Sequence, residues 1–474
     1  MPQPLTPDLC VIGAGPGGLA AAAKAASYGV SVVLVERARM GGQSLYSGAV
    51  ASTALAAAAK RFHEIQNAWN FGVRAADFSV NHREVAEYVQ SVIHAAAPNV
   101  SAERYNGLGV DLVKGSARFL DPLTAVAGPY EIKARRFIIA TGSAPLIPPI
   151  PGLDRVPYFT NETIFLHQHR IPHLLIVGGG AWALELAQAY RRLGSSVTVV
   201  TSGPALPRDD PELRNHLLKC LKEEGVRVLE NARIERIEPF GSNVQAVFAM
   251  LGKSYSIEGT HVLLAMGRAP NVADLGLDAA GIKYTERGIV VSKGLRTTNK
   301  KIFAIGDVTG ETELAHAAEH HASVALKNAL FRLPVRAHPE TMPWVTLTDP
   351  EVAHVGLTED EARSRHGRLT ILRWPYSENG RAHAEGKAGG FLKVIASRHG
   401  QILGAGIAGA QAGEIIQMWS LAMQKGISLG SMASIVSPYP TLAEINKKAA
   451  ESYFLPRAQS ALAQRVIGLL AKFG

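Results

Sequence analysis

The stretch LCVIGAGPGG, residues 9–18, decides the fold of this chain. Its four leading apolar residues predict a buried strand, and a G-x-G-x-x-G pattern with an Ala-rich helical segment follows. Gly13 permits a tight turn, Gly15 lets backbone amides approach a pyrophosphate, and Gly18 lets the helix pack on the strand. The next apolar strand ends in Glu36, which is placed to accept hydrogen bonds from ribose hydroxyls. This segment therefore predicts a dinucleotide-binding βαβ unit.

A second unit of the same kind covers residues 174–201. Its first strand runs into GGGAWA, residues 178–183, where Gly178 and Gly180 keep the pattern and Ala183 takes the third position. The chain therefore carries two dinucleotide-binding units.

The second unit leaves the choice between NADPH and NADH open. Its second strand ends in Thr201 rather than a carboxylate, so no negative charge there repels a 2′-phosphate. Arg208 follows closely enough in sequence to be a partner for that phosphate. NADPH is favoured, and NADH is retained as the alternative.

Three further apolar strands run into glycine turns: RFIIATGS (136–143), LLAMGRAPN (263–271) and KIFAIGDV (301–308). With these motifs in order, the chain resembles the two-dinucleotide-binding flavoproteins. That family includes dihydrolipoamide dehydrogenase, glutathione reductase, mercuric reductase and the soluble pyridine nucleotide transhydrogenase. The resemblance covers nearly the whole chain and extends to TLTDPEVA, residues 346–353. The segment ALELAQA, residues 183–189, is most similar to the mercuric reductase branch.

The resemblance implies an α/β fold with two Rossmann-like dinucleotide-binding domains, one for FAD and one for NAD(P)H, and a C-terminal α+β dimerisation domain. We expect the first part of the FAD-binding domain at residues 1–150 and the NAD(P)-binding domain at 151–270. The second, central part of the FAD-binding domain is expected at 271–340. The dimerisation domain, with a terminal amphipathic helix, is expected at 341–474, and the protein is expected to be a homodimer.

The cofactor contacts that the resemblance implies lie in the glycine motifs and the turns that follow the matched strands. Asp307 is expected to hydrogen-bond the ribityl chain of FAD. The full expected set is Gly13, Gly15, Gly18, Glu36, Gly42, Gln43, Gly115, Thr141, Gly142, Ser143, Asp307, Ala315, Gly178, Gly180, Ala183, Glu185, Thr201 and Gly267.

The segment GGQSLYSGAVAST, residues 41–53, departs from the family pattern G-G-T-C-x-x-x-x-C-x-x-S-K. Ser44 and Ala49 occupy both cysteine positions of the family's redox-active disulfide. Thr53 stands where the family has a lysine near flavin N5, which pairs with a glutamate matched by Glu185. Disulfide exchange requires a thiolate beside a second sulfur, so the sequence predicts that this chain is not a disulfide reductase.

The segment SPYPTLAE, residues 437–444, also departs from the family. Tyr439 replaces the histidine of the family's acid–base pair, whereas the glutamate of that pair is matched by Glu444. A phenol with a pKa of about 10 is a poor base at neutral pH. Tyr439 either donates a hydrogen bond to an acceptor oxygen or packs in the dimer interface. The candidate catalytic residues are Tyr439, Glu444 and Glu185.

Composition narrows the class of protein further. The 474 residues carry a net charge of +9 without a basic cluster, so nucleic acid is not expected as a partner. The two cysteines, Cys10 and Cys220, lie too far apart in sequence for a disulfide framework, which favours a reducing, cytoplasmic location. The histidines His316, His320 and His321 lack accompanying ligands, so no metal site is expected.

Residues 457–474 form a short basic amphipathic helix by their periodicity. Apolar side chains recur at helical spacing, and the basic side chains fall at other positions. The helix either packs on its own or the partner subunit, or makes weak contact with an anionic membrane surface. The second alternative places the protein peripherally at the inner face of the membrane. The apolar residues are Leu462, Val466, Leu469, Leu470 and Phe473, and the basic ones are Arg457, Arg465 and Lys472.

Three functions are compatible with these observations. The leading one is an FAD-dependent NAD(P)H oxidoreductase that passes electrons directly from reduced flavin to a small-molecule, non-disulfide acceptor of the quinone or diaphorase type. The second is hydride exchange between nicotinamide pools, as in the soluble transhydrogenase, which retains the lysine that Thr53 replaces here. The third is a non-catalytic flavin-binding subunit for assembly or sensing.

Overall fold

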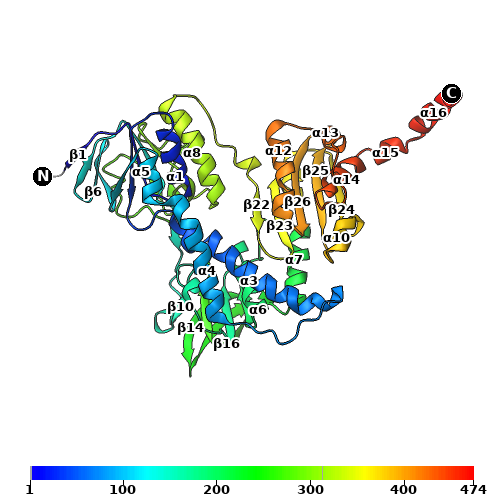
Figure 1. Ribbon diagram of the computed structural model, residues 1–474, viewed down its shortest axis with the longest axis horizontal. Coiled ribbons are helices and arrows are strands. Elements are labelled where there is room, and N and C mark those ends of the chain that lie inside the picture. Colours follow the sequence, from blue (N-terminus) through cyan, green and yellow to red (C-terminus); the bar gives the residue numbers. More distant parts are fainter. Residues whose placement is uncertain (1–2, 312, 474) are drawn as a thin grey trace. The chain divides into compact units, whose positions relative to one another are not determined.

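The computed structural model describes residues 3–311 and 313–473, and the chain divides into two compact units. The first unit comprises Met1–Ser202 and Leu229–Pro339, and the second comprises Gly203–Val228 and Glu340–Gly474. Figure 1 shows both units as mixtures of helices and sheets. The predicted α/β fold is confirmed.

The first unit contains a five-stranded parallel sheet built around the N-terminal strand. Apart from the edge strand at residues 110–114, its strands are almost entirely buried, because helices cover one face of the sheet and the strands within residues 117–132 cover the other. Helices α1 (Pro16–Ala26) and α8 (Ala315–Leu330) pack against each other (Figure 1). The strand order is β21 (Ile302–Ala304), β8 (Arg136–Ile139), β2 (Leu9–Ile12), β3 (Val32–Glu36) and β4 (Val110–Lys114).

A second parallel sheet in the same unit carries the second glycine motif. Helix α6 (Ala181–Arg192) connects its two central strands and packs against α3 (Ala49–Asn67). The strand order is β10 (Tyr158–Phe159), β17 (His261–Leu264), β11 (His173–Val177), β12 (Ser196–Val200) and β13 (Arg227–Leu229). The chain returns from the second unit to the first within β13.

Two antiparallel sheets complete the larger elements of the first unit. One consists of β14 (Arg233–Phe240), β15 (Asn243–Met250) and β16 (Lys253–Gly259). The other has the order β1 (Gln3–Leu5), β7 (Tyr130–Ile132), β6 (Thr124–Ala127) and β5 (Ala117–Asp121), in which only β1 and β7 run parallel.

The second unit is built on a five-stranded antiparallel sheet. Helices α12 (Gln417–Lys425) and α14 (Glu444–Ser452) contribute to its apolar core, in which the Trp419 side chain is fully buried. The strand order is β22 (Trp344–Thr346), β23 (Glu351–Gly356), β26 (Ile402–Gly409), β25 (Phe391–Ser397) and β24 (Leu369–Pro375).

A buried ion cluster attaches helix α7 (Pro211–Glu223) to this sheet. The Lys393 ammonium lies 2.9 Å from Asp210, 2.7 Å from Glu212 and 2.8 Å from Glu359. A hydrogen bond from Arg373 lowers the pKa of Glu212 to about 2, so this carboxylate stays charged. Because a buried ammonium is costly unless carboxylates compensate it, the cluster fixes α7 in one position on the sheet.

The C-terminus forms two short helices, α15 (Leu455–Ala458) and α16 (Ala461–Leu470). Apolar side chains from Val466 to Phe473 have exposed fractions between 47% and 82%. The side chains of Arg457 and Leu462 and all of residue 474 lie outside the described part of the chain. Within residues 3–311 and 313–473, no helix combines the length and apolar character needed to cross a membrane.

His354 makes the second unit sensitive to acid. Burial in β23 lowers the pKa of this imidazole to about 4, below its ordinary value of 6.5. The neutral form is favoured in the folded state, so stability is lost as pH falls from about 6.5 towards 4. From about pH 7.5 to pH 5, we expect the wild type to lose about 2 kcal/mol of unfolding free energy more than His354→Phe. Urea titrations at both pH values measure this difference. The same substitution at the exposed His366 is the control, and equal losses in all three proteins would refute the prediction.

Candidate functional site

The first glycine motif lies between β2 and α1, where its three glycines have different roles. Gly13 has a φ of +103°, and a Cβ there would overlap the Ala140 carbonyl oxygen. A Cβ at Gly18 would overlap the Gly13 carbonyl oxygen, so both positions are required by the fold. A Cβ at Gly15 would meet no atom within 4 Å. The backbone is therefore open to a ligand at Gly15.

The N-terminus of α1 fits the pyrophosphate of a dinucleotide. Gly15 is its N-cap, and no side chain in the described part of the chain caps this helix. Free amide groups and the helix dipole favour an anion at such a position. The Glu36 carboxylate accepts hydrogen bonds of 2.7 Å from the amides of Ala14 and Ala38. It is thereby held beside the turn and keeps lone pairs for ribose hydroxyls.

Neighbouring turns complete the predicted FAD contacts. Gly42 has a φ of +60°, and a Cβ there would lie 3.0 Å from Gly15 Cα. Gly115 follows β4, and a Cβ there would lie 2.9 Å from the Gly128 amide nitrogen. Gly142 also has positive φ, at +67°, and Ala315 is the first residue of α8. These backbone segments allow a ligand to approach closely, because they carry no bulky side chain.

Thr141 joins the end of β8 to the turn after β18 (Arg268–Pro270). Its hydroxyl donates to the Asn271 carbonyl at 2.9 Å, and the Asn271 side-chain amide donates to the Thr141 carbonyl at 2.9 Å. This reciprocal pair places Arg268 beside Ser143 and Asp307.

A chain of polar contacts runs through these residues. The Ser143 hydroxyl donates to Asp307 Oδ2 at 2.6 Å, and Arg268 Nε donates to Ser143 Oγ at 2.6 Å. Arg268 also donates to Gln43 Oε1, and Gln43 Nε2 donates to Glu162 Oε1 at 2.6 Å. Ser143, Asp307 and Gln43 are predicted cofactor contacts, and Arg268 and Glu162, which were not predicted, join them in this network. The motif GRAPN offered a signal for Arg268, whereas no motif marks Glu162.

The second glycine motif repeats the arrangement at α6. Gly178 has a φ of +123°, and a Cβ there would overlap the Ala265 carbonyl oxygen. Gly180 is the N-cap of α6, and a Cβ there would meet no atom within 4 Å. A Cβ at Gly179 would lie 2.7 Å from Thr201 Oγ1, which places Thr201 directly behind the glycine turn. This helix N-terminus therefore fits a second pyrophosphate.

The remaining predicted nicotinamide contacts surround this turn. Ala183 and Glu185 lie on α6, where Ala183 is buried and Glu185 is half-buried. Gly267, with a φ of +101°, has open space at its Cα. Trp182 lies beside them, with its ring 6.3 Å from that of Phe165 in an edge contact.

Arg208, the candidate partner of a 2′-phosphate, belongs to the second unit. Its guanidinium lies over the Trp344 ring, 4.1 Å from the centroid. The neighbouring Asp209 accepts a hydrogen bond of 2.9 Å from Trp344 Nε1. The structure therefore adds no support for NADPH over NADH.

Ser44 and Ala49, which the resemblance matches to the family's disulfide positions, lie on α2 (Gly42–Tyr46) and at the start of α3. Ser44 is half-buried, and Ala49 and Thr53 are exposed one helical turn apart. Cys10 is fully buried in β2, and burial raises the pKa of its thiol. Cys220 lies on α7 of the second unit, where burial also raises the thiol pKa.

Tyr439 and Glu444 both belong to the second unit. Tyr439 is 76% exposed, and Glu444 begins α14 and is half-buried. A Cβ at Gly380 would lie 3.1 Å from Tyr439 Oη, so the phenol rests against α10 (Gly380–Ala384). Glu185, the third predicted catalytic residue, belongs to the first unit. That these three residues are catalytic stays a prediction.

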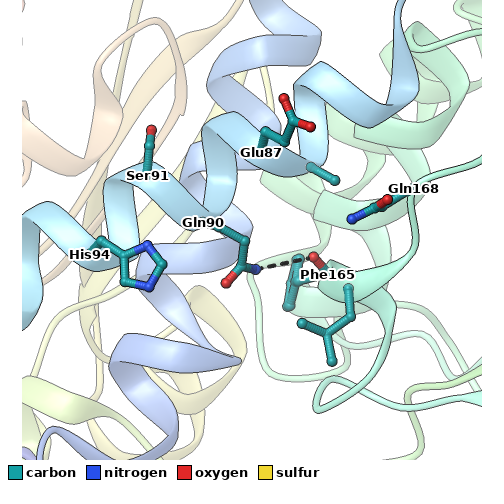
Figure 2. A pocket seen from close by; sticks show the side chains of 8 residues that line it. Glu87, Gln90, Ser91, His94, Phe165 and Gln168 are labelled. Atoms are coloured by element: carbon teal, nitrogen blue, oxygen red, sulfur yellow. Dashed lines mark hydrogen bonds between the residues drawn. The ribbon is translucent and has the colours of Figure 1, made fainter.

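A separate pocket of about 250 Å³ lies between α4 (His82–Ala96) and the segment 164–168 (Figure 2). Gln90 Nε2 donates to the Phe165 carbonyl at 3.3 Å across one wall. Its lining contains none of the predicted cofactor contacts, so we do not assign it to either dinucleotide. The lining residues are Ala86, Glu87, Gln90, Ser91, His94, Phe165, Leu166 and Gln168.

One histidine of α8, His321, is hydrogen-bonded to the protein backbone. His321 Nδ1 accepts a hydrogen bond of 3.4 Å from the Gly306 amide, and burial lowers the pKa of His321 to about 4. In the part of the chain that the structure describes, no group of three His, Cys, Asp or Glu side chains is arranged to hold a metal ion.

Two Rossmann-like βαβ units, each with an uncapped helix N-terminus, define a protein with two dinucleotide-binding sites. The family model described as pyridine nucleotide-disulphide oxidoreductase matches residues 7–322, and that family's dimerisation domain matches residues 342–450. The chain belongs to the pyridine nucleotide-disulphide oxidoreductase family. It is a flavoprotein that uses FAD and NAD(P)H, and the dimerisation domain supports a homodimer.

Known relatives cover nearly the whole chain. The dihydrolipoyl dehydrogenase of Bacillus subtilis is 34% identical over 458 residues, which are 94% of this chain and 96% of the relative. The mercuric reductase of Streptomyces lividans is 35% identical over 462 residues, again 94% and 96%. Among solved structures, LpdA of Mycobacterium tuberculosis superimposes with a TM-score of 0.87 at 25% identity, covering 94% of this chain and 99% of LpdA.

Proposed function

We propose that this protein passes electrons from NAD(P)H through FAD directly to a non-disulfide acceptor of the quinone or diaphorase type. The observation that carries the proposal is the lack of sulfur at both disulfide positions, which hold Ser44 and Ala49. The bound FAD would supply the redox chemistry, taking a hydride from the nicotinamide and giving the electron pair to the acceptor.

Neither cysteine of the chain is a substitute for the missing pair. Cys10 is enclosed in the central strand of a parallel sheet, and its raised thiol pKa suppresses the reactive thiolate. Cys220 has a raised pKa as well and lies in the other unit. The raised thiol pKa values, and the placement of the two cysteines in different units, therefore both disfavour electron transfer through a pair of protein thiols.

The exposed face at the start of α3 supports a small-molecule acceptor. Ala49 and Thr53 present a methyl group and a short polar side chain where the family has a sulfur and a lysine. These small side chains leave room for a planar acceptor beside the flavin. We propose Tyr439 as a hydrogen-bond donor to an acceptor oxygen, with Glu444 and Glu185 as further catalytic residues.

A cysteine-free variant tests this function directly. Cys10→Ala with Cys220→Ser removes every sulfur nucleophile, and we expect NAD(P)H-dependent reduction of a water-soluble benzoquinone within about twofold of the wild type. Loss of turnover in a variant that retains FAD and its melting temperature would overturn the proposal. Cys220→Ser alone is the matched control, because its site lies outside the sheet that holds Cys10.

We also propose that residues 457–474 make weak contact with an anionic membrane surface. The chain carries no acidic residue after Glu451, and Arg465 lies within α16 and Lys472 just after its end, close in sequence to the exposed apolar side chains of this helix.

Vesicle flotation tests this contact. We expect the full-length protein to float with vesicles containing anionic lipid, and truncation before residue 457 to reduce the floated fraction at least about threefold. Arg465→Glu with Lys472→Glu retains the apolar face and is expected to weaken binding similarly. Unchanged flotation of both variants, or none by the full-length protein, would contradict the proposal.

A further inference from the structure

We propose that Gln43 is a positioning residue that couples Glu162 to Arg268 and thereby fixes a cation beside the ribityl-binding residues of the flavin site. The five residues Glu162, Gln43, Arg268, Ser143 and Asp307 are here called the Gln43 relay. The inference rests on the proposed function, because it assigns to the relay the tuning of a flavin that has no dithiol beside it.

The geometry of the relay is continuous. Gln43 Nε2 donates to Glu162 Oε1 at 2.6 Å, and Gln43 Oε1 accepts from the Arg268 guanidinium. The same guanidinium donates to Ser143 Oγ at 2.6 Å and to the Ser143 carbonyl at 2.8 Å. Its Nε lies 3.7 Å from Asp307 Oδ2. Every link is direct, so a change at Glu162 reaches Arg268 through one side chain.

The chemistry of an amide suits position 43. Its NH₂ group donates to a carboxylate while its carbonyl accepts from a guanidinium, so the donor and the acceptor lie on two separate atoms of one neutral side chain. A carboxylate at position 43 would repel Glu162, and an ammonium would repel Arg268. The family pattern has threonine here, whose hydroxyl is too short to span both partners.

The segment that carries Glu162 also holds α2 in place. The buried side-chain amide of Asn161 donates to the Ser47 carbonyl at 3.1 Å, next to the end of α2. The Tyr190 hydroxyl of α6 donates to the Ile164 carbonyl at 3.5 Å. The segment thus connects α2, which carries Ser44, to the nicotinamide-binding helix. Non-covalent contacts hold α2 where a family member would have a disulfide.

The charges of the relay predict its effect on the flavin. Arg268 is the cation, and Glu162 and Asp307 are the flanking carboxylates. Flavin reduction adds electrons, so a nearby positive charge favours it and a negative charge opposes it. Gln43 holds the guanidinium towards Ser143 and Asp307, whereas Glu162 offsets part of its charge.

Midpoint potentials of the FAD-loaded variants test the relay. Glu162→Gln removes a negative charge and is expected to shift the equilibrium towards reduced flavin three- to tenfold, a positive shift of about 15–30 mV for a two-electron couple. Gln43→Ala removes one of the contacts that position the guanidinium and is expected to shift the potential in the negative direction. In the Gln43→Ala background, Glu162→Gln is expected to add less than half of its own shift, because the link between the two charges is gone.

The controls separate this relay from general charge effects and from folding. Glu87→Gln removes an exposed carboxylate that the relay does not contact and is expected to leave the potential unchanged. If Gln43→Ala loses FAD, the Glu162→Gln variant still tests the relay, because Glu162 is exposed and its substitution is expected to leave the fold intact. An unchanged potential in Glu162→Gln, or additive shifts in the double variant, would overturn the inference. The titration uses dyes and no physiological acceptor, so its failure is distinct from failure of electron transfer to quinone.

Discussion

Gly15→Ala is expected to weaken FAD binding strongly while leaving the fold intact. A Cβ at this position meets no protein atom within 4 Å, and the φ of −77° is ordinary for alanine. The methyl group would instead occupy the space in which the pyrophosphate approaches the N-terminus of α1. We expect FAD affinity to fall at least about 100-fold, equivalent to about 2.7 kcal/mol. Reconstitution of the apoprotein with FAD, followed by flavin fluorescence, measures this loss.

A matched glycine elsewhere controls for the added methyl group. Gly107 ends α5 (Ala102–Gly107), and a Cβ there also meets no atom within 4 Å. Gly107→Ala is expected to bind FAD as the wild type does. Circular dichroism of Gly15→Ala apoprotein is expected to match that of the wild-type apoprotein, since an alanine N-cap costs about 1 kcal/mol or less relative to glycine. Normal FAD affinity in Gly15→Ala would show that the pyrophosphate does not bind at this helix.

Gly180→Ala is expected to separate the two cofactors. Gly180 has the same place at α6 that Gly15 has at α1, with a φ of −76° and open space at Cα. We expect the variant to remain yellow with bound FAD and to require at least about 100-fold more NAD(P)H for half-maximal flavin reduction. Anaerobic stopped-flow absorbance with increasing NADPH, and separately NADH, gives this value.

Two outcomes would contradict the prediction for Gly180→Ala. If Gly180→Ala loses FAD rather than nicotinamide affinity, the assignment of the two βαβ units is reversed. If reduction by both nucleotides is unchanged, α6 does not bind the nicotinamide cofactor. Gly203, which also has open space at Cα, is the control position for alanine substitution in the chain that follows β12.

The parts of the fold that could be predicted from sequence are those encoded locally. Apolar strands of three to five residues followed by glycine turns predicted β2, β8, β11 and β21, because such strands are buried in parallel sheets. The glycines of both motifs were recognisable since only glycine tolerates the positive φ at Gly13 and Gly178.

Contacts between distant segments could not be predicted. Glu162 lies 119 residues from Gln43, and no spacing rule connects them. Arg208 is a candidate partner of a 2′-phosphate because it follows β12 in the sequence, and its contact with the ring of a tryptophan 136 residues later has no local signal. Side chains of this kind are positioned by tertiary packing, which local sequence patterns do not encode.

Anaerobic reduction followed by a choice of oxidants tests the central claim most directly. The wild-type protein is bleached with one equivalent of NAD(P)H and then mixed with a water-soluble benzoquinone, with oxidised glutathione, with lipoamide or with a thio-nicotinamide dinucleotide. We predict that flavin absorbance returns rapidly with the quinone and stays bleached with both disulfides. Rapid return with a disulfide would contradict direct transfer. Return only with the thio-nicotinamide dinucleotide would assign hydride exchange, and a flavin that never bleaches would assign a non-catalytic role.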